Sequence, residues 1–184
     1  MDSGSGESDP QDWFEYWDDS LEEEPLNPAE RVFLTGLRAR AAGGTWSCDP
    51  ADTLSYHHGA GRLLAGVHLD DPVSHHALLS FGVVFDGTQI VGNCIDFAEP
   101  FDFRPTEQAA MQYGGSPASL VDEAAEWFEW LMSWPIERRE WFDGGGKVVY
   151  CEWVLANAKE KLGAYGRWRP MRRPNRVTVV RGHR

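Results

Sequence analysis

Cysteines and long apolar runs are scarce in this sequence of 184 residues. Its three cysteines, Cys48, Cys94 and Cys151, are an odd number at wide spacing, which excludes a disulfide framework and a paired-cysteine metal motif. This use of cysteine favours a reducing compartment. No run of about 18 apolar residues is present, and no basic segment followed by an apolar one opens the chain, so neither a membrane span nor a signal peptide is predicted. We therefore expect a cytoplasmic protein that does not contact membranes.

Each end of the chain lacks charge of one sign. Residues 1–27 contain ten carboxylates and no Lys or Arg, whereas residues 165–184 contain seven arginines and no carboxylate. The formal net charge of the whole chain is −12, and residues 28–164 contribute −9 of it. A body of that sign repels phosphate backbones, so nucleic-acid binding is not expected outside the basic C-terminal residues.

The sequence motifs of common catalytic sites are also missing. The Gly-Ala-Gly at residues 59–61 lacks the third glycine of a nucleotide-binding fingerprint, and the three glycines at residues 144–146 lie between two strand patterns, as in a turn. No serine-nucleophile elbow is present. We predict no catalytic residue and no cofactor, and no side-chain pattern specifies one reaction.

The acidic N-terminal segment is rich in aromatic residues. Residues 1–10 are mostly Ser, Gly and Asp, a composition typical of disorder. Trp13, Trp17 and Leu21 then recur at i, i+4 and i+8, which would place them on one stripe of a short helix. Such a helix is unstable alone and would form only in a groove of a partner or of this protein. We predict a disordered tail over residues 1–27, with the partner-binding side chains Trp13, Phe14, Trp17 and Leu21.

The middle of the chain has the patterns of both helices and strands. Asn27, Pro28 and Glu30 are typical of a helix start, because they supply a cap, a first-turn proline and a capping-box glutamate. Residues 53–97 contain three apolar runs separated by turn signals, and Asp86-Gly87 between two of them indicates a hairpin. A meander of three or four antiparallel strands is therefore predicted.

In the second half of the chain, a helix is again followed by strands. Pro117 begins a second helix that ends before Pro135, and residues 107–113 are expected to form one further helical turn or two. Residues 136–155 have the alternation of a second hairpin around three glycines, and residues 175–181 that of a last strand.

These elements predict an α+β fold. The economical arrangement is an antiparallel sheet, made of a three- to four-stranded meander plus a C-terminal hairpin, with two main helices packed on one side. Residues 28–164 would form this single domain, between the tail and a basic C-terminal strand or tail at residues 165–184. The order of elements is similar to that of small bacterial α+β adaptor and immunity proteins, at the level of fold analogy alone.

Five of the six histidines lie within twenty residues of one another. Adjacent residues of a strand point to opposite faces, so each His-His pair supplies one ligand to a site unless it lies in a turn. No known metal-ligand spacing is present, and we predict no metal site. Whether these residues form a site at all is left open by the sequence. They are His57, His58, His68, His75 and His76.

Tryptophan is unusually frequent, with nine in the chain. Trp130 and Trp134 would lie along one edge of the second helix, and with Trp141 and Trp153 they would wall an aromatic groove suited to a peptide or a small hydrophobe. The alternative is that these tryptophans pack inside the protein as bulky core residues and form no groove. We assign Trp130 and Trp134 to partner binding.

The C-terminal arginines surround another tryptophan, Trp168. This pattern indicates anion binding. The anion would be the acidic tail of this chain or an acidic partner protein. The alternatives are that the arginines bind a nucleic acid, or that they bind nothing and only flank the last strand in solvent. The candidate anion-binding residues are Arg167, Arg169, Arg172 and Arg173.

Together these patterns favour a non-enzymatic interaction protein of the adaptor, inhibitor or immunity type. Its acidic aromatic tail and aromatic groove would bind a basic protein partner, because opposite charges steer association. The competing hypothesis is a small enzyme or small-molecule-binding protein that uses the histidine-rich strand ends beside an aromatic pocket. Its oligomeric state is not indicated by the sequence.

Overall fold

The structure is a computed structural model that describes residues 12–16, 25–44, 46–57, 61–96, 102–104 and 108–182. The chain forms two compact units. Unit 1 comprises the residues up to His68 together with Ser80–Glu129, and unit 2 comprises Leu69–Leu79 together with Trp130–Arg184. Among the described residues, no helix combines the length and apolar character that a membrane crossing requires.

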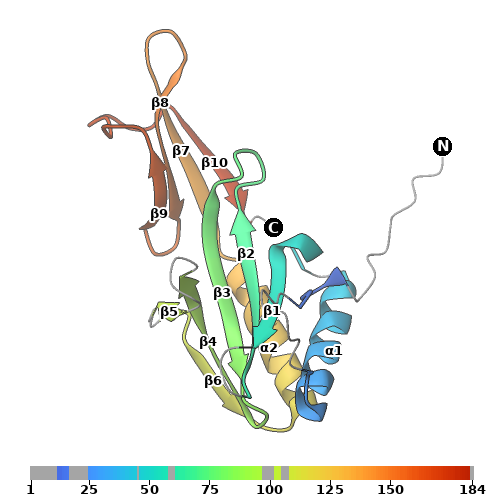
Figure 1. The fold of residues 1–184 in the computed structure, drawn as a ribbon. Coiled ribbons are helices and arrows are strands. Elements are labelled where there is room, and N and C mark those ends of the chain that lie inside the picture. The colour runs from blue at the N-terminus through green and yellow to red at the C-terminus, as the bar shows by residue number, and fades with distance from the viewer. Residues whose placement is uncertain are drawn as a thin grey trace, which may run out of the picture. The chain divides into compact units, whose positions relative to one another are not determined.

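Unit 1 is built on a sheet of six strands and two helices (Figure 1). In chain order the elements are α1 (Pro28–Ala42), the short 3-10 helix η2 (Pro50–Asp52), β1 (Thr53–His57), β2 (Leu63–Asp70), β3 (Ala77–Phe85), β4 (Gln89–Asp96), β5 (Asp102–Arg104), β6 (Met111–Gly114) and α2 (Pro117–Met132). The strands lie in the order β1-β2-β3-β4-β5, and β6 also pairs with β4. The ends of β2, β3 and α2 belong to unit 2.

Local signals in the sequence account for the start of α1 and for the hairpin between β3 and β4. The Asn27 side chain accepts hydrogen bonds from the backbone N–H groups of Ala29 and Glu30, and the Glu30 carboxylate accepts one from the Asn27 N–H, so the predicted capping box forms. The predicted hairpin also forms, since β3 and β4 pair antiparallel up to Phe85 and Ile90.

The predicted helix over residues 107–113 is wrong in its described part. Met111–Gly114 is instead strand β6, whose Gly114 pairs with Gln89 and whose Met111 pairs with Gly92. The segment has too few residues to sustain a helix alone, and pairing with β4 satisfies its backbone groups.

Both helices cover the same face of the sheet, as predicted. The ring of Phe33 from α1 stacks on Phe85 with centroids 4.6 Å apart, and Trp127 from α2 meets Phe81 edge-on at 5.9 Å. Phe81 and Phe85 are four residues apart on β3 and so project from one face. The helices also contact each other at Gly36 of α1 and Val121 of α2. The contact is so close that a side chain at Gly36 would collide with that of Val121.

The described part of the N-terminal segment is packed into the core of unit 1. Trp13 and Phe14 are buried, and Phe14 makes an edge contact with Trp46 at 5.7 Å and a tilted contact with Phe128 at 5.8 Å. The Arg38 guanidinium donates to the carbonyl oxygens of Trp13 and Phe14, both at 2.9 Å. Trp13 and Phe14, which the sequence assigned to partner binding, are therefore buried against this protein's own body, one of the two placements that the sequence left open.

The backbone of this segment is held as tightly as its side chains. The N–H of Phe14 donates to the Thr53 hydroxyl at 2.7 Å, and the Ser55 hydroxyl donates to the Phe14 carbonyl at 2.8 Å. Tyr16 then forms a parallel bridge with Ser55. The acidic composition of the segment hid this packing, because its burial depends on residues about 40 positions away. Trp17 and Leu21 lie outside the described residues.

Unit 2 contains a second antiparallel sheet, where the sequence predicted only one. Its strands are β7 (Ile136–Phe142), β8 (Val148–Leu155), β9 (Glu160–Tyr165) and β10 (Arg176–Arg181), in the order β10-β7-β8-β9. The predicted hairpin and last strand are thus confirmed, and β9 is additional. The α+β class is confirmed, while the number of sheets and strands is larger than expected.

A buried carboxylate joins the turn between β2 and β3 to this second sheet. Asp71 is fully buried, and it accepts hydrogen bonds from the Trp153 indole at 2.7 Å and from the Arg138 guanidinium at 3.0 Å. The backbone N–H groups of Val73 and Ser74 donate to the same carboxylate. Burial alone would raise the pKa of Asp71, but these hydrogen bonds and the Arg138 charge lower it to about 2.

Candidate functional site

The segment that joins β9 to β10 in unit 2 combines fixed backbone with exposed side chains; we call residues 166–175 the arginine loop. The Trp141 indole donates to the carbonyl oxygen of Arg172 at 2.8 Å. Asn175 closes the loop, since its N–H donates to the Glu140 carbonyl at 2.8 Å and its side-chain oxygen accepts from the Phe142 N–H at 2.9 Å. The loop is therefore attached to β7 at more than one point.

Two of the four predicted anion-binding arginines are engaged within unit 2. Arg169 pairs with the buried carboxylate of Glu152 at 3.2 Å and lies over the Trp141 ring, 5.5 Å from its centroid. Arg172 donates to the carbonyl oxygen of Phe142. These contacts hold the loop against the sheet, so Arg169 and Arg172 act in the structure as positioning groups.

The base of the loop is fixed by a further ion pair. Arg176, the first residue of β10, donates to both carboxylate oxygens of Glu140, at 2.6 and 2.9 Å. The hydrogen bond from Arg176 lowers the pKa of Glu140 against the opposing effect of burial. Planar two-point pairing of this kind fixes direction as well as distance.

Large apolar side chains project from the loop into solvent. Trp168 is 84% exposed, and Met171 is fully exposed. Tyr165, at the end of β9, is 70% exposed. Arg167 and Arg173 form no ion pair with any described residue. The loop thus presents Trp168 and Met171 with two uncompensated guanidinium groups on the same short segment.

The sequence placed four arginines here but did not assign Trp168, Met171 or Tyr165 to a binding site. One signal could have found them. Gly166, Pro170 and Pro174 break any strand or helix pattern, so apolar residues between them have no regular element on which to be buried.

Of the predicted tryptophan pair, only one member is accessible. Trp130 is 48% exposed and meets the buried Trp134 edge-on, with centroids 4.9 Å apart. Trp141 and Trp153 are buried within unit 2. They therefore do not wall the open aromatic groove that the sequence suggested.

The histidines that lie close together in the sequence are divided between the two units. In unit 1, the Tyr16 hydroxyl and His57 Nδ1 share a hydrogen bond of 2.7 Å, and His57 Nε2 lies 3.3 Å from the buried Glu30 carboxylate. His57 thereby links the N-terminal segment to the start of α1. His58 lies outside the described residues.

The other described histidines also make local contacts. His68 Nδ1 shares a hydrogen bond of 2.7 Å with the Ser80 hydroxyl on β3. In unit 2, His76 stacks on Trp153 with ring centroids 3.9 Å apart, and His75 has a left-handed backbone with φ of 53°. Within the described ranges, no three His, Cys, Asp or Glu side chains come together as a metal site.

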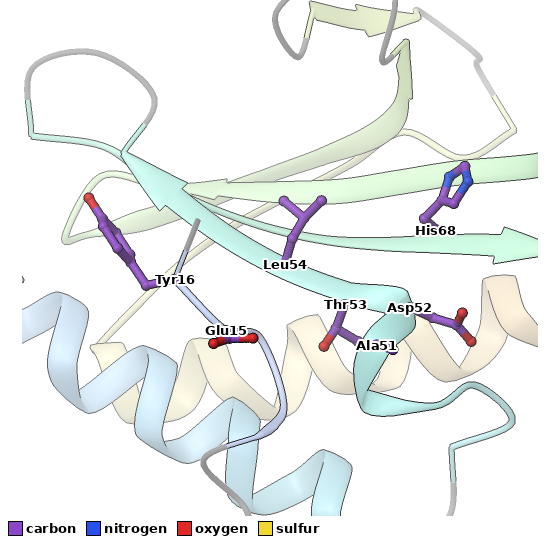
Figure 2. Close-up of a pocket in the computed structure, with 7 residues that line it drawn as sticks. All are labelled: Glu15, Tyr16, Ala51, Asp52, Thr53, Leu54 and His68. Atoms are coloured by element: carbon purple, nitrogen blue, oxygen red, sulfur yellow. The ribbon is translucent and has the colours of Figure 1, made fainter. Parts of the chain in front are cut away.

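A cleft of about 610 Å³ opens beside β1 in unit 1 (Figure 2). Leu54 and His68 line it from one face of the sheet, since Leu54 pairs with Gly66 and His68 follows two residues later on β2. Glu15 and Asp52 contribute carboxylates to it. The described residues that line it are Glu15, Tyr16, Ala51, Asp52, Thr53, Leu54 and His68.

Comparison with models of protein families, with curated proteins and with solved structures finds no match to this chain.

Proposed function

We propose that this chain is a non-enzymatic interaction protein and that the arginine loop binds an acidic surface of another protein. The observation that carries the proposal is the 84% exposure of Trp168 on a loop attached to β7 by hydrogen bonds. Trp, Met and Arg are enriched at protein interfaces, and central tryptophans commonly contribute most of the binding energy. A fixed loop also loses little conformational entropy when it docks.

The charge of unit 2 supports an acidic partner. Unit 2 carries 12 Lys and Arg against seven Asp and Glu, a formal net charge of +5, although the whole chain carries −12. Arg167 and Arg173 would face carboxylates at the rim of the partner's pocket, while Trp168 and Met171 would enter the pocket itself.

A protein fits the loop better than a nucleic acid does. Duplex-binding proteins commonly neutralise about six to ten phosphates. In the arginine loop, Arg169 and Arg172 already bind Glu152 and the Phe142 carbonyl, so two guanidinium groups remain for a partner.

The predicted basic partner of the acidic N-terminal segment remains a second proposed contact. Trp13 and Phe14 would not take part in it, since they are buried. For the location of the protein we propose the cytoplasm, because Cys48, Cys94 and Cys151 form no disulfide bond.

Comparative affinity capture tests the proposed loop surface. The bait proteins are the wild type, the double variant Trp168→Ser with Met171→Ser, and the matched control Trp130→Ser, which alters an exposed tryptophan outside the loop. We expect one acidic protein to be retained by the wild type and the control, to be lost from the double variant and to elute at about 0.5 M salt, where the Debye length is a few ångströms.

The captured protein must then bind purified wild type directly. The proposal fails if the double variant retains the same proteins as the wild type. It also fails if Trp130→Ser abolishes capture while the double variant does not, because the end of α2 would then be the binding surface.

A further inference from the structure

We infer that the cleft beside β1 binds a small organic ammonium ion that has an apolar body. This inference concerns unit 1 and does not depend on the arginine loop or its partner. The cleft volume of about 610 Å³ is within the range of about 300 to 1,000 Å³ that is common for small-molecule sites.

The charge of the lining selects for a cation. Glu15 and Asp52 are the charged residues among the described lining, which includes no lysine or arginine. Arg38 interacts with the Glu15 charge from outside the lining, and the Asp52 carboxylate accepts a hydrogen bond from the Asp49 N–H. Unit 1 as a whole has 22 Asp and Glu against five Lys and Arg, a formal net charge of −17. A cleft lined by one sign of charge concentrates ions of the opposite sign, so an anionic ligand is disfavoured here.

The remaining lining residues favour a ligand with an apolar part. Leu54 and Ala51 are aliphatic, and the Tyr16 ring adds an aromatic surface that attracts ammonium groups through its negative face. Figure 2 shows Leu54 between Tyr16 and His68 along the cleft. Leu54 also packs against the buried cluster of Leu64, Val84 and Ile95, which supports its side chain from below.

The same residues do not suit a metal ion. Calcium takes six to eight oxygen ligands, and transition metals need several His, Cys or carboxylate donors. No group of three such side chains exists among the described residues, and the aliphatic side chains of Leu54 and Ala51 offer no donor atom. An organic cation uses both the carboxylates and the aliphatic surface.

Three isosteric or near-isosteric probes separate charge from shape. 2-Phenylethylammonium is the cation, 2-phenylethanol its neutral counterpart and phenylacetate an anion. Each is titrated into the full chain while backbone amide resonances are followed by NMR, to about 10 mM, because fragments of this size commonly bind with millimolar dissociation constants. We expect the cation to shift the resonances of residues 15–16, 51–54 and His68, the alcohol to bind more weakly, and phenylacetate to leave them unchanged.

Two variants assign the contributions of charge and apolar surface. Glu15→Gln should weaken binding of the cation about two- to five-fold and leave the alcohol unaffected, as expected for one solvent-exposed ionic contact. Leu54→Ala should weaken both ligands. Glu126→Gln is the matched control, since it removes an exposed carboxylate of unit 1 on α2 and should change neither.

The inference is overturned if none of the three probes shifts the lining residues. Equal binding of cation and alcohol, with no effect of Glu15→Gln, would also overturn it, because the cleft would then be an apolar site without charge selection. Binding that Glu126→Gln weakens as much as Glu15→Gln does would show that only the general negative field is involved, and it would likewise contradict a specific site.

Discussion

The indole nitrogen of Trp141 donates a hydrogen bond to the carbonyl oxygen of Arg172 at 2.8 Å, across 31 positions of sequence. The same ring also lies beneath the Arg169 guanidinium. One buried side chain of β7 therefore holds two residues of the arginine loop, and Trp168 projects from the segment immediately before them.

Trp141→Phe should loosen this loop without unfolding unit 2. Phenylalanine keeps most of the apolar volume but cannot donate to Arg172, and loss of one such hydrogen bond costs about 1 kcal/mol. We expect faster amide hydrogen exchange over residues 166–175, with exchange in β8 unchanged. Trp130→Phe is the control and should leave the loop's exchange unaltered. Equal exchange of the loop in wild type and Trp141→Phe would mean that this contact does not hold it.

Acid should destabilise the protein through Asp71. Its pKa is about 2 in the folded protein, against an ordinary value of 3.8, so the folded state favours the ionised carboxyl. Stability from this group is fully present above about pH 5 and is lost as the pH falls toward 2. We expect this one group to lower the free energy of unfolding by about 2 kcal/mol across that window. Denaturant titrations at several pH values measure this loss.

Asp71→Asn should flatten that pH dependence. At neutral pH the variant should also be about 1 to 3 kcal/mol less stable, because Arg138 then loses its pair with Asp71 at 3.0 Å and keeps only the longer pair with Glu140 at 3.6 Å. Trp153→Phe removes one hydrogen bond to the carboxylate and should have a smaller effect on both quantities. If wild type and Asp71→Asn lose stability in parallel between pH 5 and 2, Asp71 is not the group responsible.

Phe14→Ala tests the placement of the N-terminal segment. Phe14 is fully buried between Trp46 and Phe128, and removing a buried phenylalanine side chain commonly costs about 3 to 5 kcal/mol. Chemical denaturation monitored by far-ultraviolet circular dichroism should show a loss of that size. Unchanged stability would instead support the exposed tail that the sequence suggested. Asp12→Ala, at an exposed position of the same segment, is the control.

Much of the secondary structure could be predicted because its signals are local. The capping box at Asn27 and Glu30, the Asp86-Gly87 hairpin and the alternation of β8 all depend on neighbouring residues. The pairing of strands into two sheets could not be predicted in this way. Asp71, for example, meets Arg138 from 67 positions away, and nothing near either residue indicates the other.

The candidate sites show the same limit. The arginines of residues 167–173 are conspicuous in the sequence, yet only the structure separates Arg169, which binds Glu152, from Arg167, which forms no ion pair with a described residue. Conversely, Trp13 and Phe14 lie in an acidic segment whose composition indicates partner binding, yet both are core residues. Their packing partners lie in distant segments, so no local pattern reveals this burial.

Cys151 should react slowly with alkylating reagents. Burial, with a smaller contribution from the nearby Glu140 charge, raises the pKa of its thiol to about 11. Relative to an ordinary thiol pKa of 9.0, the reactive thiolate is about 100-fold less abundant at pH 8. Iodoacetamide labelling followed by peptide mass spectrometry should find Cys151 unmodified in native protein and modified after unfolding in guanidinium chloride. Rapid native labelling would contradict its burial in β8.

The contribution of Trp168 to partner binding tests the central claim most directly. The measurement is the dissociation constant of the purified complex between the captured acidic protein and either wild type or Trp168→Ala, at fixed salt. A central tryptophan of an interface commonly contributes 2 kcal/mol or more, so we predict at least about 30-fold weaker binding by Trp168→Ala, with its stability unchanged. A change of less than about threefold would contradict the assignment of the arginine loop as the binding surface.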